Sequence, residues 1–364
     1  MDDGTDFFRE NDFSWNKVAN MLYIESPAGV GYSYADYEMP EFNDDTSAID
    51  NYNALLSWYE LFPEYKEHDL FITGESYAGI YVPYLANEII KNKDNAKFDI
   101  PLKGIAVGNG VTNWTLDTTN ALEAIGFWHN VIDLDLEDKF VEGNCFQAEE
   151  GVDINTGKRD KKMCEAAEME FFSALGGLNI YDLYRHCYRE DEGLRMGRAT
   201  IDGVEQTYTR GMTAFDYTPW VFGGLTRDQL QLKNPPCVYA SGVTDYLNRQ
   251  DVRDSLNVKT SQVWELCTDR IAYTRDFNKA SEWTYPILKE NNIRVLHYTG
   301  NTDGSVPAEG TRAWISHMGW DVTTTFRPYY VRNKQVGGFV EVYDGITYVT
   351  VQGVGHMAPQ WKPC

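Results

Sequence analysis

The 364-residue sequence contains no uninterrupted apolar run of the roughly 18 residues that a membrane-spanning helix needs. Basic residues are scarce, because 32 Lys and Arg stand against 55 Asp and Glu, and the formal net charge is -23. Nucleic acids and anionic membranes both require a basic surface, so this charge argues against either as a partner. The opening residues, MDDGTDFFREND, lack the basic and then apolar pattern of a signal peptide.

Cysteine is also sparse and shows no pattern typical of a metal site. The six cysteines include no C-x-x-C pair and have no paired histidines nearby, which argues against zinc. No glycine-rich stretch completes a G-x-G-x-x-G pattern, and none is followed by a P-loop lysine. We therefore expect no metal and no cofactor, and disulfides among the cysteines: Cys145, Cys164, Cys187, Cys237, Cys267 and Cys364.

What the sequence does contain is an alternation of short strands and helices. Four apolar runs, rich in β-branched or aromatic residues and bounded by turn-forming residues, are predicted strands: 18–24, 70–73, 104–109 and 293–299. Their continuous apolar character indicates burial on both faces, as in a parallel sheet. Helices are expected between the first two runs, behind capping residues at 44–47, and after residue 76. This order predicts an α/β core.

The middle of the chain has a different pattern. From roughly residue 116 to 270, charged helical stretches such as EDKFVEG and KKMCEAAEMEFFSAL alternate with Gly-rich loops. We interpret residues 116–270 as a helical cap inserted between two parts of the core, 1–115 and 271–364. In the second part, Asp344-Gly345 separates two alternating runs, which predicts a β-hairpin.

The stretch FITGESYAGIYVP, residues 71–83, raises the question of whether Ser76 is a nucleophile or a small residue in a turn. In a nucleophile elbow the serine sits on a sharp strand-to-helix turn, which requires small residues two positions before and after it. Gly74 and Ala78 meet this requirement. The pattern alone is weak, because turns often collect such residues.

Candidate partners for Ser76 follow in the chain order Ser, Asp, His that α/β-hydrolases use. Asp303 lies in a polar loop directly after a predicted strand, and His356 lies in a Gly-rich loop after the hairpin. Taken singly, each is better interpreted as a turn or surface-loop residue. Taken together, in this order and at strand ends, they favour a catalytic triad. His297 falls inside an apolar strand and is interpreted as a hydrogen-bonded core histidine.

Several stretches resemble the serine carboxypeptidase family. The similarity covers nearly the whole chain and includes NKVANMLYIESPAGVGYSY, FITGESYAGIYVPYLA, GIAVGNGVTN, LNRQDVRDSLNV, VLHYTGNTDGSVP and GVGHMAPQWKP, of which G-E-S-Y-A-G is specific to the family. The resemblance implies an α/β-hydrolase fold with a mostly parallel central sheet and a helical cap insertion. It also implies a serine-type carboxypeptidase that removes residues from peptide or protein C-termini.

The resemblance assigns roles to individual residues. It implies a catalytic triad: Ser76, Asp303 and His356. The Tyr77 N–H would be one oxyanion donor, Glu75 would help to bind the terminal carboxylate of the substrate, and Met357 would line the pocket for the departing residue.

The resemblance also bears on processing and location. It implies two disulfides, Cys187–Cys237 and Cys145–Cys164, and a lysosomal, vacuolar or secreted protein. The sequon Asn113-Trp114-Thr115 is compatible with secretion and makes Asn113 a candidate glycosylation site.

One departure from the family pattern concerns the start of the sequence. Family members carry, upstream of the stretch that matches SPAGVG, an Asn-Gly-Gly-Pro-Gly segment that supplies the second oxyanion N–H and part of the carboxylate site. A cysteine there pairs with the position that matches Cys267. The sequence here begins after that segment. We therefore expect a preceding segment or a separate chain linked through Cys267, and a homodimer stays open.

Two other functions stay open on the residues alone. An acyltransferase would use the same triad, and a non-catalytic binding or protective protein would keep the same fold. For the carboxypeptidase we expect acid pH to favour peptide hydrolysis, because only a protonated Glu75 can donate a hydrogen bond to a substrate carboxylate. His356 opposes this, since it must be neutral to act as a base.

Overall fold

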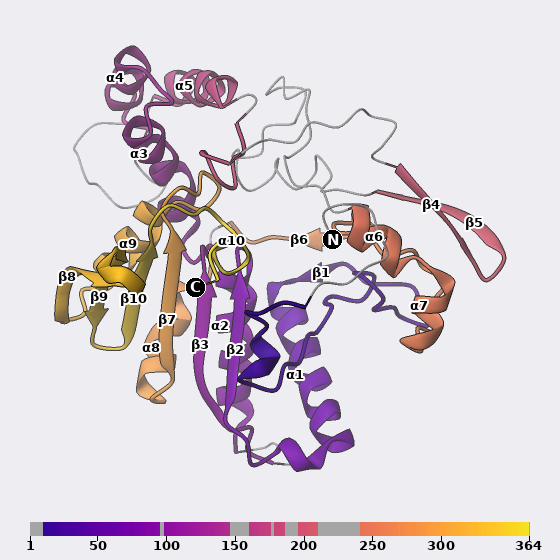
Figure 1. Cartoon of the computed structure of the whole chain (residues 1–364). Coiled ribbons are helices and arrows are strands. Elements are labelled where there is room, and N and C mark those ends of the chain that lie inside the picture. Colours follow the sequence, from indigo (N-terminus) through magenta and orange to yellow (C-terminus); the bar gives the residue numbers. More distant parts are fainter. Residues whose placement is uncertain are drawn as a thin grey trace.

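The computed structural model in Figure 1 describes residues 10–94, 98–145, 160–175, 178–185, 196–209, 241–268, 270–277 and 279–363. The predicted pair Cys187–Cys237, and Cys364, lie outside these residues. Within the described ranges, no helix combines the length and the apolar character that crossing a membrane requires.

A six-stranded mixed sheet forms the centre of the molecule, in the order β2-β3-β7-β10-β9-β8. Its strands, in that order, are Leu70–Glu75, Leu102–Gly108, Arg294–Gly300, Ile346–Val351, Val336–Tyr343 and Val322–Tyr330. The pairs from β2 to β10 are parallel, whereas β10-β9 and β9-β8 are antiparallel. Three of the four predicted strands are therefore confirmed, as is the hairpin at Asp344-Gly345. Because β3 pairs directly with β7, the sheet joins sequence segments nearly 200 residues apart.

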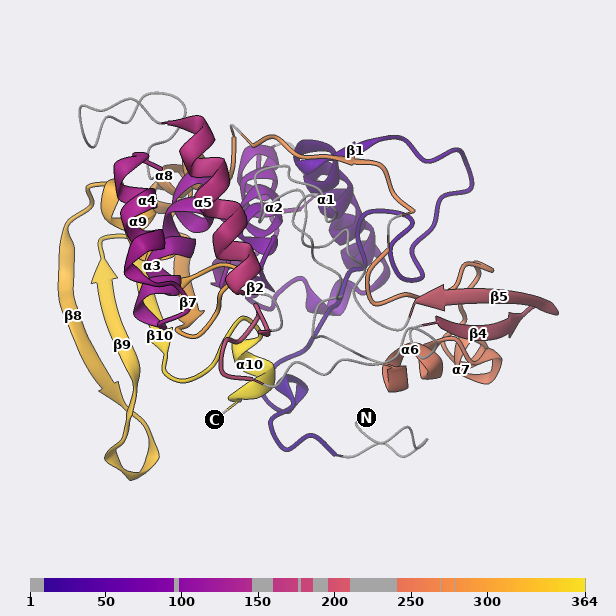
Figure 2. The same cartoon turned by 90° about the horizontal axis from the view of Figure 1, so that it is seen from above.

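Four helices lie along one face of this sheet (Figure 2): α1 (Asp44–Leu61), α2 (Ala78–Asn92), α8 (Tyr285–Glu290) and α9 (Ala308–His317). The largest apolar cluster fills the space between these helices and the strands. Tyr59 on α1, Val82 on α2 and Leu288 on α8 are all buried there. This burial of one helix face against a mostly parallel sheet confirms the α/β fold class.

Helix α1 shows how the local sequence sets a helix start. The Asn43 side chain accepts a hydrogen bond from the Thr46 N–H, and the Thr46 hydroxyl oxygen accepts one from the Asn43 N–H. This reciprocal capping box satisfies backbone donors that the first turn leaves free. The cap therefore lies one residue before the predicted range 44–47. Tyr52, Leu55 and Tyr59 then fall on the buried face, as their helical spacing predicts.

The region between β3 and β7 holds most of the remaining elements. They are α3 (Asn120–Trp128), α4 (Leu134–Glu142), α5 (Lys161–Ala174), β4 (Met196–Ile201), β5 (Val204–Thr209), α6 (Ser241–Leu247) and α7 (Gln250–Ser255). Figure 1 shows α3, α4 and α5 grouped apart from β4, β5, α6 and α7. The helical character of 134–142 and 161–174 is confirmed, whereas the β4–β5 hairpin was not predicted. The division at residues 116 and 270 stays a prediction.

The shorter elements complete the described chain. Two short strands, β1 (Phe42–Asn43) and β6 (Tyr273–Thr274), pair in parallel. Single turns and short helices are η1 (Trp15–Lys17), η2 (Pro63–Tyr65), the π-helical η3 (Thr115–Thr119), η6 (Glu282–Thr284), η7 (Arg332–Lys334) and α10 (Ala358–Trp361).

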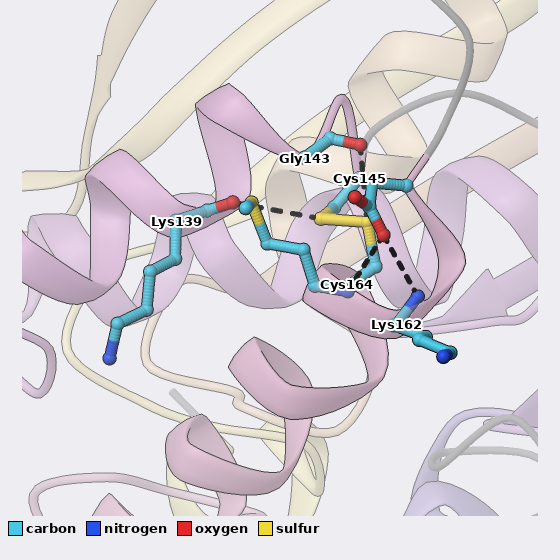
Figure 3. The surroundings of a disulfide bond; sticks show 7 residues. Lys139, Gly143, Cys145, Lys162 and Cys164 are labelled. Carbon is cyan, nitrogen blue, oxygen red and sulfur yellow. Dashed lines mark hydrogen bonds between the residues drawn. A yellow bond between two sulfur atoms is a disulfide. The ribbon is translucent and has the colours of Figure 1, made fainter.

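A disulfide joins Cys145, after α4, to Cys164 in the first turn of α5 (Figure 3). This is one of the two pairs that the family resemblance implied. Both cysteines are buried in a second apolar cluster, together with Ile125, Phe140 and Phe171. The disulfide therefore links α5 to the end of α4 inside an apolar cluster that is separate from the cluster at the central sheet.

The prediction of a strand at residues 18–24 is wrong. The segment follows η1 without strand pairing, and its side chains are largely exposed, with Val18 at 89% and Tyr23 at 74%. A strand needs a neighbour for its backbone N–H and C=O groups, and among the described residues β2 pairs only with β3. The apolar run indicated strand propensity but could not show whether a partner was in reach.

Candidate active site

Ser76 lies on the sharp turn between β2 and α2. Its φ of 66° is in the left-handed region, which side chains other than glycine seldom adopt. The Ser76 N–H donates to the Gly108 carbonyl at 2.9 Å, and the Ser76 carbonyl accepts from the N–H groups of Gly79 (2.9 Å) and Val111 (3.1 Å). The strained turn is thus held by β3 and the residues that follow it, as a nucleophile elbow requires.

Small residues make this turn sterically feasible. A Cβ added to Gly74 would overlap the Cβ of Ala78, and a Cβ added to Gly79 would overlap the carbonyl oxygen of Val111. The first contact is the reason for small residues two positions before and after Ser76, as the sequence predicted. The second shows that Gly79 also lets α2 approach the loop after β3.

Asp303 and His356 form a buried hydrogen-bonded pair. The His356 Nδ1 and Asp303 Oδ2 are 2.6 Å apart, and the two residues are 3% and 0% exposed. The Asp303 carboxylate also accepts from the N–H groups of Ser305 (2.7 Å) and Val306 (3.1 Å). These donors fix the carboxylate, which in turn fixes the His356 ring. The structure therefore brings together two residues that stand 53 positions apart in the sequence.

Asn109, which the sequence did not single out, connects this pair to the strand ends. Its Nδ2 donates to Asp303 Oδ2 at 2.9 Å, its Oδ1 accepts from the Gly300 N–H at 2.8 Å, and its own N–H donates to the Tyr298 carbonyl at 2.9 Å. Asn109 is fully buried and has a φ of 40°. The available signal was an Asn directly at the end of a buried strand.

His356 has only one ring nitrogen left for proton exchange. Nδ1 is engaged with Asp303, while Nε2 is buried and has no hydrogen-bond partner among the described residues. No hydrogen bond joins Ser76 to His356 within that part of the chain either. Such contacts often tighten only when substrate binds.

Opposing electrostatic effects act on His356 and Glu75. Burial lowers the pKa of His356, but the charge of Asp303, its hydrogen bond and the charge of Glu75 together raise this pKa above its usual value. Burial raises the pKa of Glu75 to about 7, although the His356 charge opposes this change. Glu75 therefore lies close enough to the Asp303–His356 pair to influence it.

The other predicted site residues lie around this centre. Among the described residues the Tyr77 N–H donates no hydrogen bond that would occupy it. The Tyr77 hydroxyl donates to buried Asp44 at 2.8 Å. Met357 directly precedes α10 and packs on the cluster that contains the disulfide. His297 is a core residue, 2.7 Å from the Tyr285 hydroxyl, and burial lowers its pKa to about 3.

Asn113 is the candidate glycosylation site. The Asn113 side-chain amide donates a hydrogen bond to Glu282 at 2.6 Å and accepts one from the Leu116 N–H at 3.0 Å. These bonds do not test glycosylation of Asn113, which stays a prediction.

Within the described ranges, no group of three or more His, Cys, Asp or Glu could hold a metal ion.

The family model for serine carboxypeptidases matches residues 1–364. The chain belongs to the serine carboxypeptidase family. Serine carboxypeptidase 24 of Arabidopsis thaliana is 34% identical, over 97% of this chain and 71% of that protein. The lysosomal protective protein of Mus musculus is 32% identical, over 97% of this chain and 74% of that protein.

A solved structure supports the fold of this serine carboxypeptidase chain. The prohormone-processing carboxypeptidase Kex1(delta)p of Saccharomyces cerevisiae superposes with a TM-score of 0.66 at 20% identity, covering 97% of this chain and 73% of that one. The α/β-hydrolase fold is thus confirmed. Family membership and the carboxypeptidase relatives also support the predicted enzyme class, a serine-type carboxypeptidase hydrolase.

Proposed function

We propose that the chain removes C-terminal residues from peptides through an acyl-enzyme formed on Ser76. The observation that carries this proposal is the buried Asp303–His356 pair, 2.6 Å apart, in a family chain whose Ser76 sits on a strained elbow. A serine hydroxyl becomes a nucleophile only when a base removes its proton, and His356 Nε2 is suited to that task.

The proposed reaction assigns each residue one step. Ser76 Oγ attacks the scissile carbonyl carbon while His356 takes the hydroxyl proton, and Asp303 stabilises the imidazolium that forms. The Tyr77 N–H donates to the developing oxyanion. The carbon–nitrogen bond then breaks as His356 gives the proton to the leaving amine, and water releases the acyl group by the same route.

Glu75 is proposed to recognise the terminal carboxylate of the substrate. Because burial raises its pKa to about 7, Glu75 is largely protonated in mildly acidic solution. A protonated carboxyl can donate a hydrogen bond to the carboxylate, whereas an ionised one repels it. Met357, next to His356, is proposed to contact the departing residue. This assignment favours an acidic compartment, as the name of the mouse lysosomal relative suggests.

The partner predictions follow from the same proposal. Peptide and protein C-termini are the substrates, and the link from Cys267 to a further segment and the homodimer both stay predictions. Non-reducing peptide mapping and sedimentation of the native protein test them separately.

Replacing the nucleophile tests the proposed function. Ser76→Ala should lower kcat by several orders of magnitude, because the triad acts as a unit, while the unfolding temperature stays near that of the wild type. Release of free amino acids from peptides is the assay. A fluorophosphonate should label the wild type and not the variant. Activity of Ser76→Ala near wild type would remove Ser76 from the mechanism, and labelling with acyl transfer to alcohols but no hydrolysis would identify an acyltransferase.

A further inference from the structure

The Leu178–Arg185 segment, which follows α5, contacts both loops that carry the acid and base candidates. Three backbone hydrogen bonds join it to them: Leu183 N–H to the Thr302 carbonyl (3.0 Å), Gly304 N–H to the Ile180 carbonyl (2.8 Å) and His356 N–H to the Tyr181 carbonyl (2.7 Å). The first two bonds flank Asp303 on either side. The third holds the backbone of His356 itself.

Side chains add a fourth link, between Asp182 and Thr302. The Thr302 hydroxyl donates to Asp182 Oδ1 at 2.8 Å, and Asp182 is only 5% exposed. The same oxygen accepts from the Tyr184 N–H at 3.2 Å, while the Arg185 Nε lies 3.6 Å from Oδ2. A carboxylate held this way by its own segment is a fixed acceptor for the residue before Asp303.

Packing leaves the two loops little freedom to move away from this segment. A Cβ on Gly355 would overlap the Tyr181 carbonyl oxygen, and a Cβ on Gly304 would lie 3.0 Å from the Ile180 carbonyl oxygen. The Tyr181 ring also lies against the His356 ring, with centroids 5.1 Å apart. At both glycines the loop backbone contacts the backbone of the segment directly, so a shift of the segment should shift the loops with it.

The segment belongs to the core that contains the disulfide. Ile180, Tyr181 and Leu183 are buried in the same apolar cluster as Cys145 and Cys164. The position of the segment is thus set by its packing with α4 and α5, while its polar groups bond the residues on either side of Asp303 and the backbone of His356.

We propose that Asp182 is a positioning residue, which holds Asp303 against His356 through the Thr302 hydroxyl. The catalytic part of this inference rests on the proposed function. Its geometric part, the hold on the Asp303–His356 pair, does not depend on any substrate.

Three threonine variants test the proposal. Thr302→Val removes the donor to Asp182 and keeps the side-chain shape, Thr302→Ser keeps the hydroxyl, and Thr311→Val is the matched control. Thr311 is likewise buried and its hydroxyl faces a buried carboxylate, Asp117, at 3.4 Å. All three are compared with the wild type by unfolding temperature, by kcat and KM on one peptide, and by NMR of the His356 ring.

We expect Thr302→Val to lower kcat roughly 10- to 100-fold, since small displacements of catalytic groups have effects of that size, with little change in KM. The pKa of His356 should fall, because Asp303 and Glu75 are the charges that raise it and Asp303 would be held less closely. Thr302→Ser should recover most of the lost kcat. Asp182→Ala, which removes the acceptor, should resemble Thr302→Val, and Thr311→Val should change neither kcat nor the His356 titration.

The NMR titration separates this inference from the proposed function. If the wild type hydrolyses no peptide, the proposed function fails, yet a lowered His356 pKa in Thr302→Val would still support the hold on Asp303. An unchanged His356 pKa in folded Thr302→Val, or a change equal to that in Thr311→Val, would overturn the inference whatever the activity. If Thr302→Val does not fold, Asp182→Ala decides by the same titration.

Discussion

At the scale of single residues, the site is a set of buried polar groups whose ionisation is coupled. The Glu75 charge helps to raise the pKa of His356, and the His356 charge opposes the rise in the pKa of Glu75. Protonating Glu75 therefore removes one cause of the raised His356 pKa, which lets His356 stay neutral at lower pH. Two groups that interact in this way titrate as a pair rather than independently. The conflict between an acidic Glu75 and a basic His356 is thereby reduced.

Glu75→Gln should change the pH dependence of peptide hydrolysis on both sides of its optimum. For a free peptide, wild-type kcat/KM should fall on the alkaline side near pH 7, where Glu75 ionises, and on the acid side as His356 protonates. Glutamine donates a hydrogen bond at every pH, so the alkaline fall should disappear. The negative charge that raised the pKa of His356 is also gone, so the acid limb should move to lower pH.

An amidated peptide is the control for Glu75→Gln, because it has no terminal carboxylate to repel. On the wild type, its alkaline limb should lie at higher pH than that of the free peptide. Superimposable wild-type profiles for the two peptides would remove Glu75 from carboxylate recognition.

At the scale of elements, what the sequence could predict was local, and what it missed was pairing. The strand-turn-helix around Ser76 follows from apolar runs and small residues within 25 positions, so it was predictable. The segment 18–24 is similarly apolar, but among the described residues no strand pairs with it, and nothing in its local sequence shows that. The β4–β5 hairpin did carry a sequence signal, the dipeptide Asp202-Gly203. Both residues adopt positive φ, as a tight Asp-Gly turn requires.

The missed site residues have the same explanation. Asn109 reaches Asp303, and Asp182 reaches Thr302, across 194 and 120 positions of sequence. Each contact depends on which strands are neighbours and on where the segment after α5 returns to the sheet. The candidate triad, by contrast, could be proposed from the sequence alone, because each of its members follows a recognisable strand.

Gly79→Ala tests the close approach of α2 to the loop after β3. The added methyl group would meet the Val111 carbonyl oxygen, so helix and loop must separate. We expect a loss of about 1–3 kcal/mol in the free energy of unfolding, together with a lower kcat, because the Val111 N–H holds the Ser76 carbonyl. Denaturant unfolding and peptide assays measure the two effects.

Gly319→Ala is the matched control for Gly79→Ala. Gly319 has open space around it but a φ of 66°, so its substitution should cost about 1 kcal/mol from backbone strain and leave kcat unchanged. Equal kcat values for Gly79→Ala and Gly319→Ala would show that α2 can move away from the loop after β3 without disturbing Ser76.

At the scale of the whole molecule, the dominant property is the net charge of -23. The ion pairs of the described residues mostly join exposed side chains, which contribute little to stability. Like charges that are not offset repel one another in the compact state more than in the unfolded chain. Near neutral pH this repulsion should therefore lower the stability of the folded state.

Salt should accordingly raise the unfolding temperature at pH 7.5. Raising NaCl from about 20 to 300 mM shortens the screening length severalfold, and we expect an increase of roughly 1–3 °C by calorimetry. At pH 5 the increase should shrink, because Glu75 and Asp117, whose pKa values burial raises to about 7, become neutral. The core His297, with a pKa of about 3, does not contribute to that change.

Sucrose at equal osmolality is the control, since it stabilises without screening and its effect should not depend on pH. A lower unfolding temperature in salt at pH 7.5 would mean that attractive ion pairs outweigh the net repulsion.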